Sequence, residues 1–322
     1  MTGEPARRIS DEPGRRSDAA FSPDGTRLAT VGDDGTVRVR DVATGAVVGE
    51  FTSPDTELGT VAFSPDGTRL AVGTDITLDT LIAAGRVVNH EGEVLLLDAT
   101  RMALLHRLPT GSLPENPQVT DNDADDDTDS SNTASALAFR PDGRALVAPL
   151  SAGRVAVWDL ADPAVPPRML DGNGELATDA AFTPDGSVLA TTGADRSVQL
   201  WSLPDDRPRA IARGVTPTRA VAFSPDGALV ATASQDELLR VWTMPDGQPV
   251  AVIDRHGDAL NDVAFDDTGR LISAGADGSV MVWDLDPDRA VATVCHILDP
   301  ATLDESWRAL GPDLGDAPRC PG

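Results

Sequence analysis

A phrase of eleven residues recurs along this chain, and its spacing constrains the fold more than any other feature. Five close copies are AAFSPDGTRLA from Ala19, VAFSPDGTRLA from Val61, LAFRPDGRALV from Leu137, AAFTPDGSVLA from Ala180 and VAFSPDGALVA from Val221. A divergent sixth copy, VAFDDTGRLIS, begins at Val263. The phenylalanines of the six copies lie 42, 76, 43, 41 and 42 residues apart. A period near 42 residues, built from short apolar segments, predicts stacked or ringed units rather than one irregular core.

Each unit carries the signals of four strands. Alternating apolar residues on both sides of the Pro-Asp-Gly turn predict two strands, and the turn residues supply the backbone angles that join them. About nineteen residues after most of the phenylalanines comes a tryptophan or a substitute, which closes a third strand; these residues are Arg40, Leu97, Trp158, Trp201, Trp242 and Trp283. A fourth strand follows a Thr-Gly turn, as at residues 44–51. Four strands per 42 residues are the dimensions of one propeller blade.

The third-strand phrases DGTVRVRD from Asp34, GRVAVWDL from Gly153 and DGSVMVWDL from Asp277 resemble the WD-repeat (WD40) family over residues 2–285. The resemblance implies an all-β fold, a β-propeller of four-stranded antiparallel blades. The ending with Cys295, Trp307 and Cys320-Pro321 resembles the tails of some bacterial WD-repeat proteins. We therefore expect a propeller of the bacterial type.

The repeats predict six blades, with seven as the alternative. The long interval between the second and third phenylalanines is interpreted as one blade with an insertion at residues 75–91, followed by an acidic loop at 111–133. We expect a propeller over residues 1–290 and a helical tail over 291–322. The segment after Trp283 is already expected to be helical, with Asp286 as the N-cap and Pro287 at the first helical position.

The beginning of the chain predicts how the ring closes. Residues 2–10 align with the turn and outer strand at 44–53 but follow no blade of their own. The last blade lacks a fourth strand, so the N-terminal strand is expected to pair with the strand bearing Trp283 and hide both sheet edges. The competing interpretation is that this chain is the end of a longer protein with blades upstream.

The composition excludes several classes of partner and chemistry. The net charge of −26 and the pI near 4.3 disfavour nucleic acid and anionic membranes as partners. All 26 basic residues are arginine, and a chain without lysine cannot form a Walker A loop, a kinase site or a lysine Schiff base. There is no signal segment or long apolar run, so we expect a cytoplasmic protein without membrane contact.

Two groups of residues resemble catalytic or metal sites, and we interpret both as structural. The family resemblance implies that His256, Ser273, Asp277 and Trp283 form a buried polar network inside the last blade, whereas Asn173 and other residues stand at the histidine position elsewhere. The acidic run at 121–129 lacks the glycine and glutamate of an EF-hand, so a solvated loop is favoured over bound Ca²⁺ or a basic partner. We expect no cofactor, no metal and no catalytic residue.

The cysteines Cys295 and Cys320 leave two interpretations open. A disulfide between them would pin the tail, whereas reduced thiols are usual in the cytosol. A zinc site is disfavoured because His296 is the single histidine nearby.

The resemblance implies a non-catalytic, monomeric scaffold that binds proteins or peptides through the loop-rich face of the ring. On that face we expect the residues four positions before each phenylalanine and the neighbouring turn residues, namely Ser17, Gly59, Ser135, Thr178, Arg219, Asn261, Asp33, Arg196 and Gln235. Arg219 and Arg196 are the favoured contacts, because arginine is enriched in interface hot spots. The alternatives are a sensor module of a larger signalling protein and a metal-dependent propeller hydrolase or lactonase.

Overall fold

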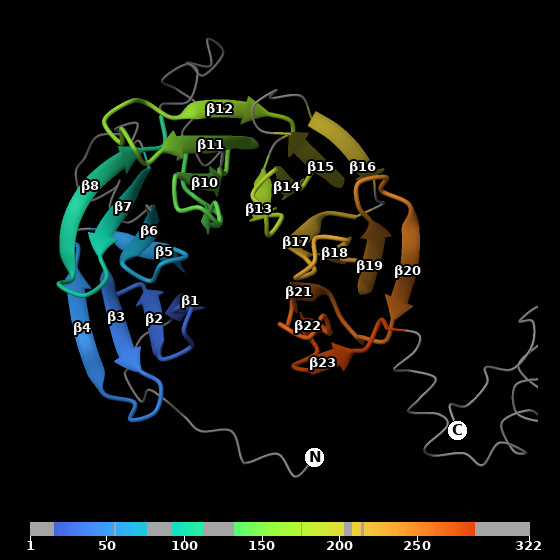
Figure 1. Ribbon diagram of the computed structural model, residues 1–322, viewed down its shortest axis with the longest axis horizontal. Helices are drawn as coiled ribbons and strands as arrows, with labels where there is room; N and C mark the ends of the chain where they lie inside the picture. Colours follow the sequence, from blue (N-terminus) through green and yellow to red (C-terminus); the bar gives the residue numbers. More distant parts are fainter. Residues whose placement is uncertain are drawn as a thin grey trace, which may run out of the picture.

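The computed structural model describes residues 16–54, 56–75, 92–111, 132–174, 176–202, 208–213 and 216–286. Within these ranges the chain forms six small antiparallel sheets and no helix. The sheets stand one after another around a central axis, as blades 1 to 6 of a propeller (Figure 1). The first strand of a blade lies near the axis and its last strand at the circumference.

Each of the first three blades has four strands. Blade 1 consists of β1 (Arg16–Phe21), β2 (Arg27–Gly32), β3 (Thr36–Asp41) and β4 (Val47–Thr52). Blade 2 consists of β5 (Glu57–Phe63), β6 (Arg69–Asp75), β7 (Glu93–Asp98) and β8 (Ala103–Pro109). Blade 3 consists of β9 (Ala138–Phe139), β10 (Ala145–Pro149), β11 (Arg154–Asp159) and β12 (Arg168–Asp171).

The last three blades repeat the same order. Blade 4 consists of β13 (Ala177–Phe182), β14 (Val188–Gly193), β15 (Ser197–Ser202) and β16 (Pro208–Arg213). Blade 5 consists of β17 (Thr218–Phe223), β18 (Leu229–Ser234), β19 (Leu238–Thr243) and β20 (Pro249–Asp254). Blade 6 has three strands among the described residues, β21 (Leu260–Phe265), β22 (Leu271–Gly275) and β23 (Val280–Trp283).

The Pro-Asp-Gly phrase makes the turn between the first and second strands. In blade 1 the Ser22 hydroxyl donates to Asp24 Oδ1 at 2.6 Å, and the Thr26 amide donates to the same oxygen at 3.1 Å. Gly25 takes φ = +68°, a conformation that glycine adopts without steric cost. Asp66 and Asp185 accept the same bonds in blades 2 and 4, so the turn is a repeated local device.

The hydrophobic core lies between neighbouring blades. Val37 and Val39 of blade 1 pack with Val61 and Phe63 of blade 2 in one buried cluster. Four further clusters join blades 2 and 3, 3 and 4, 4 and 5, and 5 and 6. Each sheet therefore depends on its neighbours for the burial that stabilises it.

The predicted architecture of six mostly four-stranded antiparallel blades is confirmed. The strand after the expected insertion is β7, at the predicted place after Gly92. Two features of the structure depart from the repeat pattern. Phe21 is exposed although the other repeated phenylalanines are partly or fully buried, and Asn132, within the expected acidic loop at 111–133, is buried. Asn132 Nδ2 donates to the carbonyls of Thr110 and Gly111, so it belongs to the body of the protein.

Several predictions fall outside the described residues. These are the closing strand at 2–10, most of the insertion and of the acidic loop, the helical tail, and the cysteine pair Cys295 and Cys320. They stay predictions.

The inter-blade core makes a large-to-small substitution costly. Leu146 of β10 is fully buried in the cluster between blades 2 and 3. We expect Leu146→Ala to lower the free energy of unfolding by about 2–5 kcal/mol in urea denaturation. Leu105→Ala on the exposed outer strand β8 is the control, with an expected loss below about 1 kcal/mol. Equal losses would contradict a core located between the blades.

Candidate partner-binding face

The strand registers define two rims of the propeller. In blade 1 Arg16 lies opposite Gly32, and Thr36 opposite Thr52. The start of the first and third strands and the end of the second and fourth strands therefore share one edge, which we call the upper rim. It carries the turn between the second and third strands and the connection from each blade to the next. The lower rim carries the Pro-Asp-Gly turns.

The residues predicted to contact a partner all occur at upper-rim positions of their blades. Ser17, Asp33, Ser135, Arg196, Gln235 and Asn261 are exposed, and Gly59, Thr178 and Arg219 are partly buried. They come from the beginnings of six first strands and from three turns, so the rim is assembled from residues far apart in the chain.

Three of these residues make hydrogen bonds between neighbouring blades. Thr178 Oγ1 of blade 4 donates to the Thr218 carbonyl of blade 5 at 2.7 Å. Arg219 Nη1 of blade 5 donates to Asn261 Oδ1 of blade 6. Sequence reasoning treated Arg219 and Asn261 as separate contact candidates, whereas the structure makes them one polar pair across a blade junction.

Arg196 and Glu237 have an unusual backbone conformation. They occupy the same turn position in blades 4 and 5 with φ = +68° and +67°. The equivalent residues in blades 1, 3 and 6 are glycines, Gly35, Gly153 and Gly278, also with positive φ. A side chain at such a position costs about 1–2 kcal/mol relative to an ordinary backbone conformation. Both side chains are exposed, so packing of these side chains within the protein does not offset the backbone strain.

Three aspartates on the innermost strands were missed by the sequence analysis. Asp18, Asp179 and Asp262 each stand three residues before the phenylalanine of their blade. Asp18 Oδ2 accepts the Val61 amide of blade 2 at 2.9 Å, and Asp179 Oδ2 accepts the Val221 amide of blade 5 at 2.8 Å. The signal was present, because alignment of the repeats places the three carboxylates at one position.

The surroundings of these carboxylates perturb their protonation. Burial raises the pKa of Asp179 to about 7, against the lowering effect of two backbone amides, and the charges of Asp262 and Asp18 add to the rise. Burial also raises the pKa of Asp262, with a further contribution from Asp18. Aspartates of the lower-rim turns behave oppositely: hydrogen bonds from Ser22 and Thr26 lower the pKa of Asp24 to about 2.

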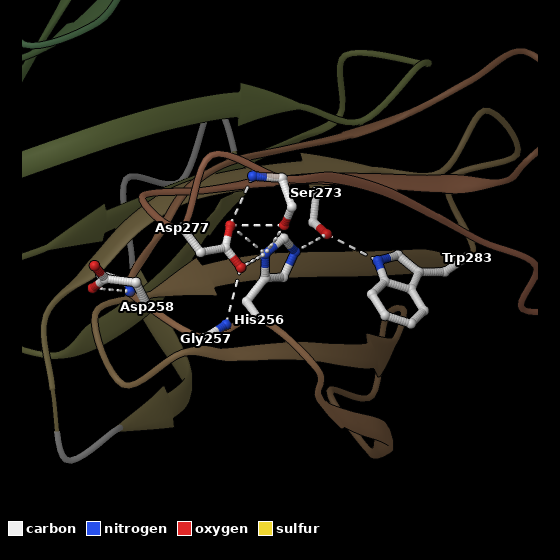
Figure 2. A network of polar contacts seen from close by, with 8 residues as sticks. His256, Gly257, Asp258, Ser273, Asp277 and Trp283 are labelled. Atoms are coloured by element: carbon white, nitrogen blue, oxygen red, sulfur yellow. Dashed lines mark hydrogen bonds and ion pairs between the residues drawn. The ribbon is translucent and has the colours of Figure 1, made fainter. Parts of the chain in front are cut away.

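A polar network connects the strands of blade 6 (Figure 2). His256 Nε2 lies 2.7 Å from Ser273 Oγ, which accepts the Trp283 indole N–H at 2.9 Å. On the other side of the ring, His256 Nδ1 lies 3.1 Å from Asp277 Oδ2, which also accepts the Gly257 amide at 2.9 Å. The hydrogen bond from the Gly257 amide is the main reason that the pKa of Asp277 lies well below its usual range, and His256 lowers it further.

Blade 4 contains a shorter version of this network. Trp201 Nε1 donates to Thr191 Oγ1 at 2.8 Å, and Thr191 donates to Asn173 Oδ1 at 2.7 Å. Asparagine therefore takes the place of histidine in this network, at the position where the alignment of the repeats put Asn173. In blades 3 and 5 the series is broken, since Trp158 Nε1 and Thr232 Oγ1 are buried without a partner among the described residues.

This arrangement gives the serine no route to nucleophilic chemistry. Ser273 is 1% exposed, and its oxygen already accepts the tryptophan N–H, so a substrate cannot approach it. The ranges that the structure describes contain no cluster of three metal-binding side chains and no helix long and apolar enough to span a membrane. The upper rim carries exposed side chains that differ from blade to blade.

Sequence comparison supports a WD40 propeller. The profile "WD domain, G-beta repeat" matches residues 14–41, 165–202, 214–243 and 247–284, which is less than half of the chain. WD repeat and SOCS box-containing protein 1 is 37% identical over 68 residues in Takifugu rubripes and 35% identical over 68 residues in Homo sapiens. Protein groucho of Drosophila melanogaster is 38% identical over 72 residues.

These alignments cover a small share of this chain and a small share of each relative. The alignments to the WD repeat and SOCS box-containing proteins cover 21% of this chain and 16% of each relative. The alignment to groucho covers 22% of this chain and 10% of the relative. The chain thus spans a small part of its curated relatives, which are animal proteins, and the bacterial resemblance of the tail stays a prediction.

Removing the central hydroxyl of the blade 6 network tests its contribution to stability. Ser273→Ala leaves the Trp283 N–H and His256 Nε2 without their partner, so we expect a loss of about 1–3 kcal/mol in the free energy of unfolding. Thr232→Val at the equivalent position of blade 5 removes a hydroxyl without a partner and is expected to be neutral or stabilising. The opposite order in thermal or urea unfolding would contradict the network.

Asp179 predicts a specific pH dependence. Its pKa in the folded state is raised from 3.8 to about 7, so its stabilising contribution is full below pH 3.8 and is lost as pH rises through about 7. We expect Asp179→Asn to flatten the decline of unfolding free energy between these pH values, measured by urea titration. Asp185→Asn is the control: its lowered pKa of about 2 confines its effect to more acidic solutions. An unchanged slope for Asp179→Asn would contradict the assignment.

Proposed function

We propose that this chain is a non-catalytic scaffold that binds protein or peptide segments on the upper rim of its propeller. The observation that carries the proposal is the left-handed backbone of Arg196 and Glu237. Glycine occupies the same turn position in three other blades without strain. We infer that the side chains of Arg196 and Glu237 have a function that compensates for the strain in blades 4 and 5.

The position of the two residues favours a contact with a partner. They lie at the same place on adjacent blades, and both are exposed. The interlocked side chains Thr178, Arg219 and Asn261 give the same sector of the rim a fixed shape. A pair of opposite charges on a rigid support fits a partner segment with complementary charges, because electrostatic complementarity gives specificity and speeds association.

The chemistry of the chain favours a protein partner. The net charge of −26 repels nucleic acid, and WD40 propellers generally bind proteins. The burial of Ser273 supports a role without catalysis.

A second candidate is an interaction module within a longer signalling protein. It is favoured by the comparisons, in which the matched repeats form 16% or less of relatives such as groucho.

The test replaces the two strained residues together. We expect the double variant Arg196→Gly, Glu237→Gly to lose partner recovery in affinity capture from an extract of the source organism, relative to the wild-type chain. Its free energy of unfolding should not fall, since relief of about 1 kcal/mol of backbone strain per site offsets the added freedom of glycine in the unfolded chain, about 0.4–1 kcal/mol.

The control for this capture experiment lies on the opposite rim. Arg101, in the turn between β7 and β8, is highly exposed, and Arg101→Ala should leave recovery unchanged. Unchanged recovery by the double variant, or a loss of recovery by Arg101→Ala alone, would contradict the choice of rim.

A further inference from the structure

The innermost strand of blade 5 contacts both neighbouring blades close to the upper rim. β17 lies between β13 of blade 4 and β21 of blade 6 around the central axis (Figure 1). Thr178 of β13 donates to the Thr218 carbonyl of β17, and Arg219 of β17 donates to Asn261 of β21. Thr178, Arg219 and Asn261 each stand at a β-bulge of their strand, a feature that is frequent next to functional sites.

Asp179 adds a third contact to β17, and its carboxylate joins two blades. Its Oδ1 accepts the Ala180 amide of its own strand at 2.8 Å, and its Oδ2 accepts the Val221 amide of β17 at 2.8 Å. An ionised carboxylate has acceptor oxygens only, so two amide donors match the charged form of Asp179. The charged form also makes the stronger hydrogen bond to an amide.

The surroundings of Asp179 favour the neutral form instead. The strands packed against β13 are β9, β10, β14 and β17, and the one charged side chain within these four strands is Arg219, which binds Asn261. From the innermost strands of blades 1 and 6, the carboxylates of Asp18 and Asp262 add negative charge. Burial and these two like charges raise the pKa of Asp179 to about 7.

These opposed preferences make the protonation of Asp179 consequential for β17. Protonation relieves the cost of burying a charge, which raises the total free energy of unfolding. It also turns Asp179 into a weaker acceptor, so the single bond to the Val221 amide weakens. Val221 follows Arg219 by two residues, so the weakened bond lies directly beside the rim contacts.

We propose that Asp179 is a proton-controlled switch on β17: proton uptake weakens the bond to Val221 and loosens the rim sector formed by Thr178, Arg219 and Asn261. The switch is not a general feature of the repeat, because blades 3 and 5 carry Ala136 and Ala220 at the position of Asp179. Regulation of partner binding by this switch rests on the proposed function, whereas the switch itself does not.

Amide NMR of the full chain without a partner tests the switch. We expect the amide of Val221 and the rim amides of Thr178 and Arg219 to shift together with one midpoint near pH 7. In Asp179→Asn these shifts should disappear, because the substituted side chain does not titrate. Histidine side chains change charge in the same pH range, and a shift caused by them would persist in this variant.

Two further variants make the test specific. Asp262→Asn keeps the carboxyl of Asp179 but removes one like charge, so it should lower the midpoint observed at Val221. Asp226→Asn, in the lower-rim turn of blade 5, is the matched control and should leave that midpoint unchanged. The proposal is overturned by a Val221 amide that does not titrate, by a titration that survives in Asp179→Asn, or by rim amides that stay unmoved.

Affinity capture on both sides of the midpoint separates the switch from the proposed function. We expect wild-type recovery of an upper-rim partner to be about fivefold or more lower below the midpoint, and Asp179→Asn to abolish this difference. Equal recovery by the wild type at both pH values would overturn the regulation of the rim. A wild-type chain that recovers no partner at either pH would contradict the proposed function, and the NMR titration would still decide the switch.

Discussion

Packing of one sheet against the next is the interaction on which the rest of this structure depends. Each blade is too small to bury a core of its own, and the apolar residues of the third strand are covered by the first two strands of the following blade. Arg27 and Arg69 tie the same junctions together by lying over the next phenylalanine and binding the next turn. A row built in this way has two ends without a neighbouring blade, which explains why Val280 and Val282 of blade 6 and Phe21 of blade 1 are exposed.

The two rims use their polar residues for different purposes. On the lower rim Asp24, Asp66 and Asp185 bind the hydroxyls and amides of their own turns, which lowers their pKa and fixes the same turn conformation in blades 1, 2 and 4. On the upper rim the equivalent turns differ, with glycine in some blades and Arg196 or Glu237 in others. The rim that we propose to bind a partner is thus the one whose turns differ in chemistry from blade to blade.

The buried polar networks differ from blade to blade, so the blade fold tolerates changes in these side chains. Blade 6 has the full series from Asp277 through His256 and Ser273 to Trp283. In blade 4 the series is shorter and Asn173 takes the place of the histidine. Blade 3 buries Trp158 without an acceptor among the described residues. Because the apolar junctions supply most of the burial, a blade can lose its polar network and keep its fold, so these side chains mark stability more than chemistry. The short matches to WD-repeat relatives agree with a shared repeat pattern.

The sequence alone determined the number of described blades, the position of nearly every strand and the Pro-Asp-Gly turns, because strand alternation and turn geometry are properties of neighbouring residues. It also placed the candidate rim residues on one edge, since register follows from short hairpins. Only the tertiary structure decided the pairing of Arg219 with Asn261, the burial of Asn132 and the exposure of Phe21. The same holds for the amide-binding role of Asp18 and Asp179 and for the hydrogen bond that Asn173, at the histidine position of blade 4, accepts from Thr191. Most of these depend on which residue of the next blade, some 42 positions away, comes into contact, and a local pattern holds no information about that neighbour.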